Sequence, residues 1–296
     1  MAKARGKSRD SEGTEEMDAA KIAELDRRTL LKGAAAATGA AALAPQDAVA
    51  QNKNAIADAA VVTESVTFKS GADTIKGFIA RPKADGKQGS VILIPDIFGL
   101  SDYAKETAAQ IAQSGVSAIA VDFYSRATEP VPQDFGMLRA YVGKYAPDTQ
   151  IVQDGLAAIA FMSKKDYVSG KFGVTGFCMG GRITLLLAAN SPAVVAASPY
   201  YGPVKSSGPT SLSAIDLTDK IKGAVQGHYG ATDMNPKPDD VKEFYEKLKA
   251  TNPHGEYFIY PGAGHAFHSY SRPSFNPEAA GTAWSRTLAF FGKHLK

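Results

Sequence analysis

The stretch KFGVTGFCMGGRITLLLAAN, residues 171–190, contains the turn that decides the fold. Its first six residues are typical of a buried strand, and its second half, from Met179 to Asn190, is typical of a helix. Between them stands the chain's only cysteine, Cys178, with Gly176 and Gly180 two residues away on either side. A nucleophile at a sharp strand-to-helix turn needs small neighbours because the backbone there is strained. The stretch therefore predicts an exposed thiol at the carboxyl end of a sheet, where the start of a helix favours a thiolate. The alternative is a buried structural cysteine, which is the usual fate of a lone one.

Short apolar runs alternate with segments of helical spacing on both sides of this turn. Two alternating segments, 61–70 and 74–82, predict an antiparallel hairpin that opens the fold. Further strands are expected at 90–96, 116–123, 171–176, 194–202, 223–230 and 255–261, and helices at 103–115, 149–165, 179–190, 239–250 and 278–295. Strand and helix in repetition predict right-handed crossovers and one mostly parallel, twisted α/β sheet flanked by helices.

Two further polar residues follow predicted strands in the order that a catalytic triad requires. Asp233 comes just after the strand at 223–230, and His265 comes just after the last strand. In this kind of sheet the order along the chain is nucleophile, acid, histidine, each on a loop after a strand. We therefore predict a triad of Cys178, Asp233 and His265, in which the carboxylate orients the histidine base.

The remaining histidines and carboxylates are weaker candidates. His268 lies three residues after His265, but no third ligand stands at a spacing suited to a metal site, so no metal is expected. Asp122 ends a strand, where a binding role and a turn role are both open. The others are interpreted as packing, surface or helix-capping residues: His228, His254, His294, Asp239 and Asp240.

Composition and charge exclude several classes of protein. The 296 residues are 44% hydrophobic and 21% charged, which suits a globular domain with a sizeable core. A net charge of +3 gives no basic surface for nucleic acid. A single cysteine excludes an internal disulfide and a multi-cysteine zinc site.

The first 50 residues differ from the rest of the chain. DRRTLLKG (26–33) precedes GAAAATGAAALA (33–44), an apolar run too short to span a bilayer, and Ala48-Val49-Ala50 matches a cleavage site. This pattern predicts a twin-arginine export signal at 26–50 within a flexible tail, recognition by the twin-arginine translocase, no stable membrane anchor, and a periplasmic single domain at 51–296. The alternative is a disordered tail with a chance pair of arginines.

Five motifs carry a resemblance to a known family: IPDIFGL (94–100), VDFYSR (121–126), GFCMGG (176–181), the loop at Asp233, and YPGAGHAFH (260–268). With them the chain resembles the dienelactone hydrolases (carboxymethylenebutenolidases), which are α/β hydrolases with a cysteine nucleophile. The resemblance implies that Cys178 attacks, that His265 is the base and that Asp233 orients it, with no metal or cofactor. It also implies an oxyanion hole made by the backbone N–H groups of Ile97 and Met179, as is general for this fold.

The sequence departs from the family at two places. Asp96 stands where the family usually has a glutamate that holds the resting thiol, and the shorter side chain predicts a looser hold or none. Arg126 matches a family arginine that pairs with the substrate carboxylate, although a surface ion pair is the alternative. A second family arginine is replaced by Ser269, and Arg272 follows three residues later.

Together these features predict hydrolysis of a small ester or lactone through a thioester on Cys178. Aromatic residues beside the motifs are expected to wall the substrate, unless they belong to the core: Phe98, Tyr124, Tyr201 and Phe267. A monomer is expected. The alternatives are a general carboxylesterase, a redox or ligand-binding thiol protein on the same fold, and a structural role on a decayed scaffold. The complete set of cysteine, aspartate and histidine argues against the last of these.

Overall fold

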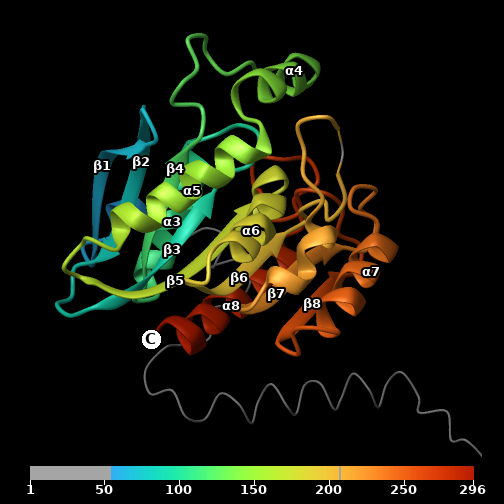
Figure 1. The fold of residues 1–296 in the computed structure, drawn as a ribbon. Helices are drawn as coiled ribbons and strands as arrows, with labels where there is room; N and C mark the ends of the chain where they lie inside the picture. Colours follow the sequence, from blue (N-terminus) through green and yellow to red (C-terminus); the bar gives the residue numbers. More distant parts are fainter. Residues whose placement is uncertain (1–54, 207) are drawn as a thin grey trace, which may run out of the picture. The chain divides into compact units, whose positions relative to one another are not determined.

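The computed structural model describes residues 55–206 and 208–296, and its central feature is one eight-stranded sheet (Figure 1). The predicted export signal and the cleavage site after Ala50 lie outside the described residues. No helix in the described part of the chain is long and apolar enough to cross a membrane.

The sheet is parallel except at its beginning. Its strands lie in the order β1-β2-β4-β3-β5-β6-β7-β8. β2 pairs antiparallel with both β1 and β4, and all other pairs are parallel, which confirms the predicted fold class and opening hairpin. The strands are Val61–Ser70 (β1), Asp73–Pro82 (β2), Gln88–Ile94 (β3), Ser117–Asp122 (β4), Val168–Phe177 (β5), Val194–Tyr200 (β6), Ala224–Gly230 (β7) and Gly255–Tyr260 (β8).

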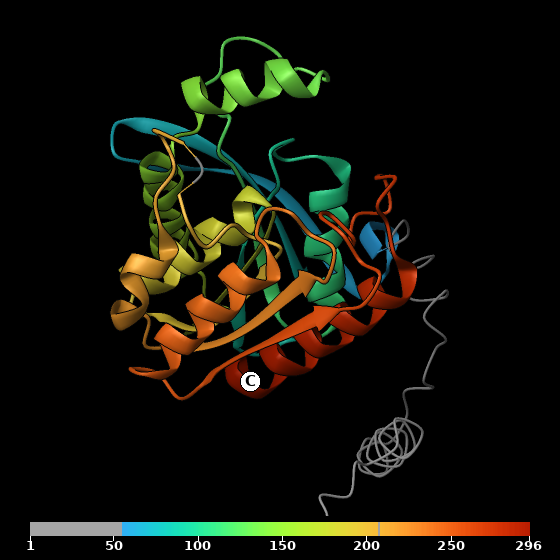
Figure 2. The ribbon, with the colours of Figure 1, turned by 90° about the vertical axis from the view of Figure 1, so that its right-hand side faces the viewer.

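Helices cover both faces of the sheet, so each face has its own hydrophobic core (Figures 1 and 2). α3 and α8 pack on one face, and α5, α6 and α7 pack on the other. The helical segments are Asp102–Gln113 (α3), Phe135–Tyr145 (α4), Asp148–Met162 (α5), Met179–Asn190 (α6), Ala214–Lys220 (η3, a 3-10 helix), Pro238–Lys249 (α7) and Pro277–Leu295 (α8). Burial on both faces explains why the central strands are continuous apolar runs, such as VILI in β3.

α4 is a helix that the sequence pattern did not predict. Asp134 caps its first turn, because the side chain accepts a hydrogen bond from the N–H of Met137 at 2.9 Å. The helix stands at the edge of the molecule beyond the carboxyl ends of the central strands (Figure 2). Its inner side chains, Leu138 and Tyr141, are buried, so packing holds it against the core.

Candidate active site

The backbone of Cys178 forms the sharp turn between β5 and α6 that the sequence predicts. Its φ of 56° and ψ of −118° lie in a region that few residues other than glycine adopt. A Cβ at Gly180 would lie 2.2 Å from the carbonyl oxygen of Ile94, and one at Gly176 would lie 2.4 Å from that of Gly180. The glycines are therefore required because backbone passes directly against backbone on both sides of the thiol.

Three loops at the carboxyl ends of β5, β7 and β8 bring the predicted triad residues together. The Sγ of Cys178 lies 3.0 Å from Nε2 of His265. Nδ1 of the same ring lies 2.9 Å from Oδ2 of Asp233. The other carboxylate oxygen of Asp233 accepts the N–H of Asn235 at 2.8 Å, so this buried side chain is held at both oxygens. The contacts form one continuous chain from sulfur to carboxylate, the arrangement needed for a nucleophile, its base and an orienting acid.

The environment of His265 favours its protonated form. Burial alone would lower the pKa of His265, but hydrogen bonds to Asp233 and Cys178 raise that pKa to about 10. These contacts therefore favour the form of the ring that carries a proton on both nitrogens, with Nδ1 facing the carboxylate and Nε2 facing the sulfur.

Tyr201 and Phe267 belong to the core beside His265 and do not line the cavity that contains Cys178. Both side chains are fully buried. The ring of Tyr201 lies edge-on to His265 at 5.2 Å, and it also contacts Phe267 at 5.3 Å. Of the two expectations for these aromatic residues, the structure shows a place in the hydrophobic core. The ring of Tyr201 packs against the imidazole of His265.

A cavity of about 810 Å³ opens above the sulfur. Besides the triad it is lined by Ile97, Met179, Arg182, Thr232, Met234, Asn235, by the loop residues Pro203, Gly208, Pro209, Thr210 and Ser211, and by Phe135, Arg139, Val142 and Gly143 of α4. Sequence reasoning missed the α4 residues. The sequence does contain a signal for this helix. Asp134 is a suitable N-cap, and apolar residues follow at 138, 141, 142 and 145, which is helical spacing.

Asp96 lies beside the site but does not hold the thiol. Its Oδ1 accepts the N–H of Phe98 at 3.0 Å, whereas the sulfur of Cys178 contacts His265. Burial raises the pKa of Asp96, and the nearby charges of Arg272 and His265 lower it in part. The side-chain contact of the sulfur is thus with His265, and an effect of the shorter side chain at position 96 on the thiol stays a prediction.

The two expected oxyanion donors occupy suitable positions. Ile97 and Met179 both line the cavity. Met179 is the first residue of α6, so its N–H has no acceptor within the helix. The loop at Ile97 is held by Tyr124, whose hydroxyl donates to the Ile97 carbonyl at 2.8 Å. Both residues therefore lie at the cavity that holds the sulfur, and their role as oxyanion donors stays a prediction.

Arg126 does not reach the cavity. Its guanidinium forms a bidentate pair with Asp154, at 2.7 and 2.9 Å, and a further contact with Asp73. The side chain of Asp154 is fully buried, so the arginine compensates a charge inside the protein. The expectation that Arg126 binds a substrate carboxylate finds no support here, and the ion-pair alternative describes what the structure contains.

Replacing Arg126 by glutamine is expected to destabilise the fold and leave catalysis nearly unchanged. Breaking a buried ion pair costs about 3 kcal/mol or more, because the remaining carboxylate stays buried without a partner. Urea unfolding should show this loss, and kcat/KM for an ester should change less than about twofold. Lys144→Gln is the control, because its pair with Glu129 is exposed and is worth less than about 1 kcal/mol. A large loss of kcat/KM in Arg126→Gln without a loss of stability would show that Arg126 does bind the substrate.

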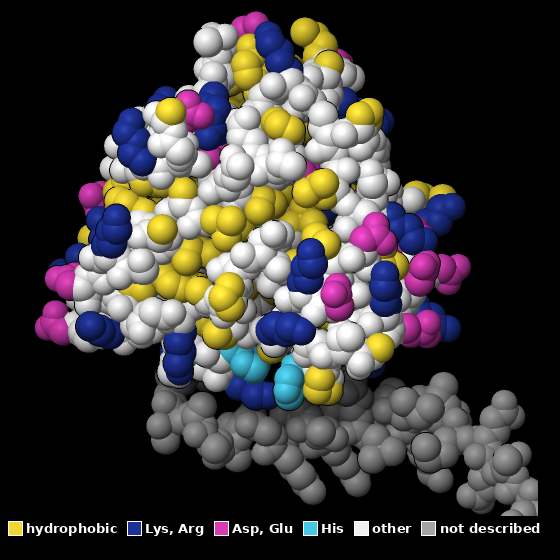
Figure 3. All heavy atoms as spheres, viewed as in Figure 1, with side chains coloured by type: hydrophobic (Ala, Val, Ile, Leu, Met, Phe, Trp, Pro, Cys, Tyr) yellow, Lys and Arg dark blue, Asp and Glu magenta, His cyan; other side chains and the backbone are white. Residues whose placement is uncertain are grey.

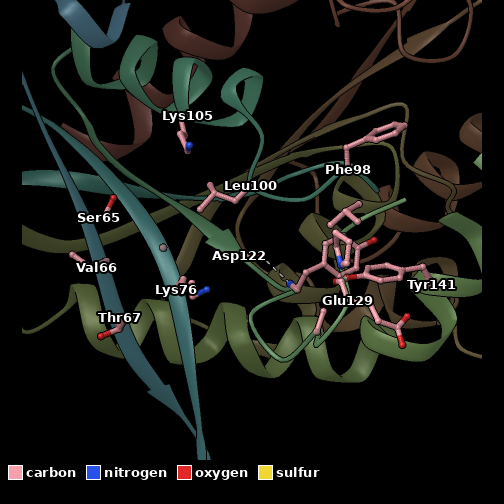
Figure 4. Close-up of a pocket in the computed structure, with 15 residues that line it drawn as sticks. Ser65, Val66, Thr67, Lys76, Phe98, Leu100, Lys105, Asp122, Glu129 and Tyr141 are labelled. Carbon is pink, nitrogen blue, oxygen red and sulfur yellow. Dashed lines mark hydrogen bonds between the residues drawn. The ribbon is translucent and has the colours of Figure 1, made fainter. Parts of the chain in front are cut away.

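Phe98 and Tyr124 line a second cavity of about 640 Å³ on the β1–β2 side of the molecule (Figure 4). The guanidinium of Arg272 stacks on the ring of Phe98 at 3.8 Å, while Ser269 is buried and hydrogen-bonds Ser271. Phe98 and Tyr124, which are expected to wall the substrate, thus line another cavity. Ser269 and Arg272, at or near the position of the second family arginine, do not line the cavity above Cys178 either.

The other polar candidates have structural roles. His268 is buried against Tyr103, 2.6 Å from its hydroxyl, and burial lowers its pKa to about 3. His228 is buried between the hydroxyls of Tyr260 and Thr287. Asp122 accepts the N–H of Tyr124 at a turn, His254 is exposed, His294 packs on Phe290, and Asp239 and Asp240 lie in the first turn of α7. No group of three or more potential metal ligands occurs among the described residues.

Comparison with known proteins places this geometry in context. Residues 75–295 match the model of the dienelactone hydrolase family, and residues 24–44 match that of the twin-arginine translocation pathway signal sequence. The latter indicates export. A protein of Salmonella typhimurium assigned as a carboxymethylenebutenolidase is 33% identical over 246 residues, covering 80% of this chain and 89% of the relative. A Bradyrhizobium protein assigned as a 2-oxo-3-(5-oxofuran-2-ylidene)propanoate lactonase is 30% identical, covering 74% of this chain and 89% of the relative.

Solved structures agree with the fold. A crystal structure from Klebsiella pneumoniae, assigned as a dienelactone hydrolase, superposes with a TM-score of 0.75 at 31% identity, covering 79% of this chain and 99% of that one. A dienelactone hydrolase-like promiscuous phosphotriesterase from metagenomic libraries has a TM-score of 0.69 at 21% identity, covering 80% of this chain and 100% of that one, which shows the shared fold alone.

Proposed function

This chain belongs to the dienelactone hydrolase family, and from that premise we propose that it hydrolyses esters or lactones of small molecules through a thioester on Cys178. The observation that carries the proposal is the unbroken chain of contacts from Sγ through the imidazole of His265 to the carboxylate of Asp233, at 3.0 and 2.9 Å, on the wall of a large cavity. The relatives assigned as carboxymethylenebutenolidase and as a lactonase support the choice of bond.

Acylation begins with the thiolate that the protonated His265 stabilises. The sulfur forms a bond to the carbonyl carbon, and the carbonyl electron pair moves to oxygen, where the N–H groups of Ile97 and Met179 stabilise the negative charge. As the carbonyl re-forms, the bond to the alkoxy oxygen breaks. The proton on Nε2 of His265 passes to that oxygen, which leaves as an alcohol, or stays tethered when the substrate is a lactone.

Deacylation uses the now neutral His265 as a base. The ring takes a proton from water, and the hydroxide oxygen bonds to the thioester carbon. Collapse of the second tetrahedral intermediate breaks the carbon–sulfur bond and returns the thiolate beside a protonated ring. Asp233 holds the ring in one orientation through both steps and stabilises its positive charge.

We place this activity in the periplasm of the producing cell. The twin-arginine signal match at 24–44 supports export in the folded state by the translocase. The domain from residue 51 onward is then the mature enzyme. A single cysteine suits that compartment, because the chain holds no second thiol with which Cys178 could form an internal disulfide.

The pH dependence of kcat/KM on two esters tests the proposed acid. With ethyl butyrate, kcat/KM is expected to stay constant from about pH 7 to 9 and to fall as the pH rises through about 10, because His265 then lacks the proton that the leaving group needs. With p-nitrophenyl butyrate the fall should be absent, since p-nitrophenolate leaves without a proton.

Circular dichroism at pH 10.5 is the control for unfolding in this comparison. Equal losses for both esters in folded protein would contradict the role of His265 as the acid. Absence of turnover with both esters and with a five-membered enol lactone, together with rapid alkylation of Cys178, would favour the redox-thiol alternative. Turnover of the esters without the lactone would favour a general carboxylesterase.

A further inference from the structure

We propose that α4 is the substrate-selecting element of this enzyme, and that it selects esters with a bulky apolar acyl chain that ends in an anionic group bound by Arg139. The inference rests on the proposed function in that it concerns the cavity above Cys178. It concerns residues of α4 to which neither the family resemblance nor the predicted triad gives a role.

One face of α4 is used for packing. Leu138 and Tyr141 are buried, and Tyr145 continues the same face at a spacing of four residues. The hydroxyl of Tyr141 donates to the carbonyl of Glu129 at 2.6 Å, and its ring lies 5.0 Å from that of Tyr124. These contacts hold the helix against the core. They involve only this face, so the residues on the opposite face are not needed for packing.

A second face of α4 lines the cavity of the candidate active site. Phe135, Arg139, Val142 and Gly143 follow one another at the spacing i, i+4, i+7, i+8, which places them on one side of a helix. The side chain of Phe135 is 61% exposed although it is large and apolar. A helix face that combines an aromatic ring and a guanidinium at the edge of a reactive cavity suits a ligand with an apolar body and an anionic end.

The charges that line the cavity single out Arg139. The guanidinium of Arg182 is paired with the buried carboxylate of Asp148 through two contacts of 2.8 Å. The carboxylate of Asp233 is paired with His265. Arg139 forms no ion pair with any residue in the described part of the chain. Its positive charge is therefore available to a ligand, and carboxylates are the partners that a guanidinium binds in bidentate fashion.

Apolar side chains at the cavity indicate that the rest of the ligand, apart from its anionic end, is apolar. Five large hydrophobic side chains are exposed in the described part of the chain. Two of them, Phe135 and Met234, line this cavity. Apolar side chains gathered around an opening mark a binding surface. A volume of about 810 Å³ accommodates a ligand much larger than an acetyl ester.

Gly143 supplies a means to test the role of this face without disturbing the fold. A Cβ at this position would meet nothing within 4 Å, because the glycine faces the cavity. A large side chain there can fill the space above the sulfur. Lys144 is the matched control on the same helix, since it pairs with Glu129 and does not line the cavity.

Three p-nitrophenyl esters separate chain length from charge: the acetate, the hexanoate and the hexanedioate monoester. Wild-type kcat/KM is expected to rise in that order. Arg139→Gln should lower kcat/KM for the monoester by about 10- to 100-fold, the size expected when a charged hydrogen-bonding partner is lost, and should change the other two less than about threefold. Gly143→Phe should lower kcat/KM for the hexanoate and for the monoester by about tenfold, and should change kcat/KM for the acetate less than about twofold. Lys144→Gln should change none of them.

A binding measurement keeps this inference separate from the proposed chemistry. In Cys178→Ala protein, the monoethyl ester of hexanedioate, whose free end is anionic, is expected to bind at least about tenfold more tightly by calorimetry than the uncharged ethyl hexanoate, and Arg139→Gln should abolish the difference. If this result holds while no ester is turned over, the role of α4 stands and the proposed hydrolysis fails. Equal effects of Arg139→Gln on hexanoate and monoester, or no effect on either, would overturn the role of Arg139.

Discussion

Replacing Cys178 by alanine is expected to reduce kcat/KM for any ester substrate by a factor on the order of 10⁴–10⁶, the loss seen when a covalent nucleophile is removed. The reason is that no other side chain at the turn can accept the acyl group, whereas the oxyanion donors and His265 remain. In wild-type protein quenched during turnover, mass spectrometry should detect an acyl group on the peptide that contains Cys178. In the variant this adduct should be absent.

Unchanged folding of the alanine variant is the necessary control, and the thermal midpoint should lie close to that of the wild type. Alanine fits the turn no worse than cysteine does, because both carry a Cβ at the same positive φ of 56°. Retention of more than about a tenth of the activity would show that the nucleophile lies elsewhere. An adduct on another residue would lead to the same conclusion.

Replacing Gly180 by alanine is expected to destabilise the fold by more than about 4 kcal/mol, an effect at the upper end for a single substitution. The added Cβ would lie 2.2 Å from the carbonyl oxygen of Ile94 and 2.4 Å from that of Pro95. Both atoms belong to backbone, so no side-chain rotation can relieve the overlap, and the start of α6 must move away from β3. Urea unfolding of the purified variant, or its failure to accumulate as folded protein, measures the effect.

Gly143→Ala is the matched substitution, again glycine to alanine within a helix. A Cβ there has open space, and alanine in a helix interior is favoured over glycine by about 0.5–1 kcal/mol. The two variants should therefore change stability in opposite directions. If Gly180→Ala folded with wild-type stability, the requirement for a glycine in the nucleophile turn would be wrong.

The sequence was sufficient to predict the sheet and the meeting of the triad residues, because both follow from local rules. Apolar runs, helical spacing and turn residues located the strands, and a parallel sheet collects the ends of its strands at one edge. Cys178 follows β5 directly, and Asp233 and His265 lie on the loops after β7 and β8, so little depended on long-range packing. Their catalytic roles, and the division of the chain at residue 50, stay predictions.

These local rules do not predict the contacts of side chains whose partners lie on other elements. Arg126 follows β4 as expected, but its partners, Asp154 on α5 and Asp73 at the start of β2, depend on how separate elements pack. Phe98 and Tyr124 belong to the motifs at 94–100 and 121–126, yet they line the other cavity and not the one above the sulfur. The position of an aromatic residue in the sequence therefore does not predict which cavity its ring lines.

α4 shows a different limit. The segment contains two glycines, and its apolar residues include aromatic and β-branched ones, so helix propensity is weak. Its formation depends on the cap at Asp134 and on the burial of Leu138 and Tyr141 against the core. Tertiary packing thus decided an element that propensity did not indicate.

The two faces of α4 also bear on how such an enzyme diverges. Substitutions at residues 138, 141 and 145 are constrained by stability, while those at 135, 139 and 143 alter the cavity and leave the packed side untouched. A lineage can therefore explore new substrates by drift on one side of a single helix, without first acquiring mutations that compensate for lost stability. Libraries randomised at those three cavity-facing positions would sample new specificities from a population that remains largely folded.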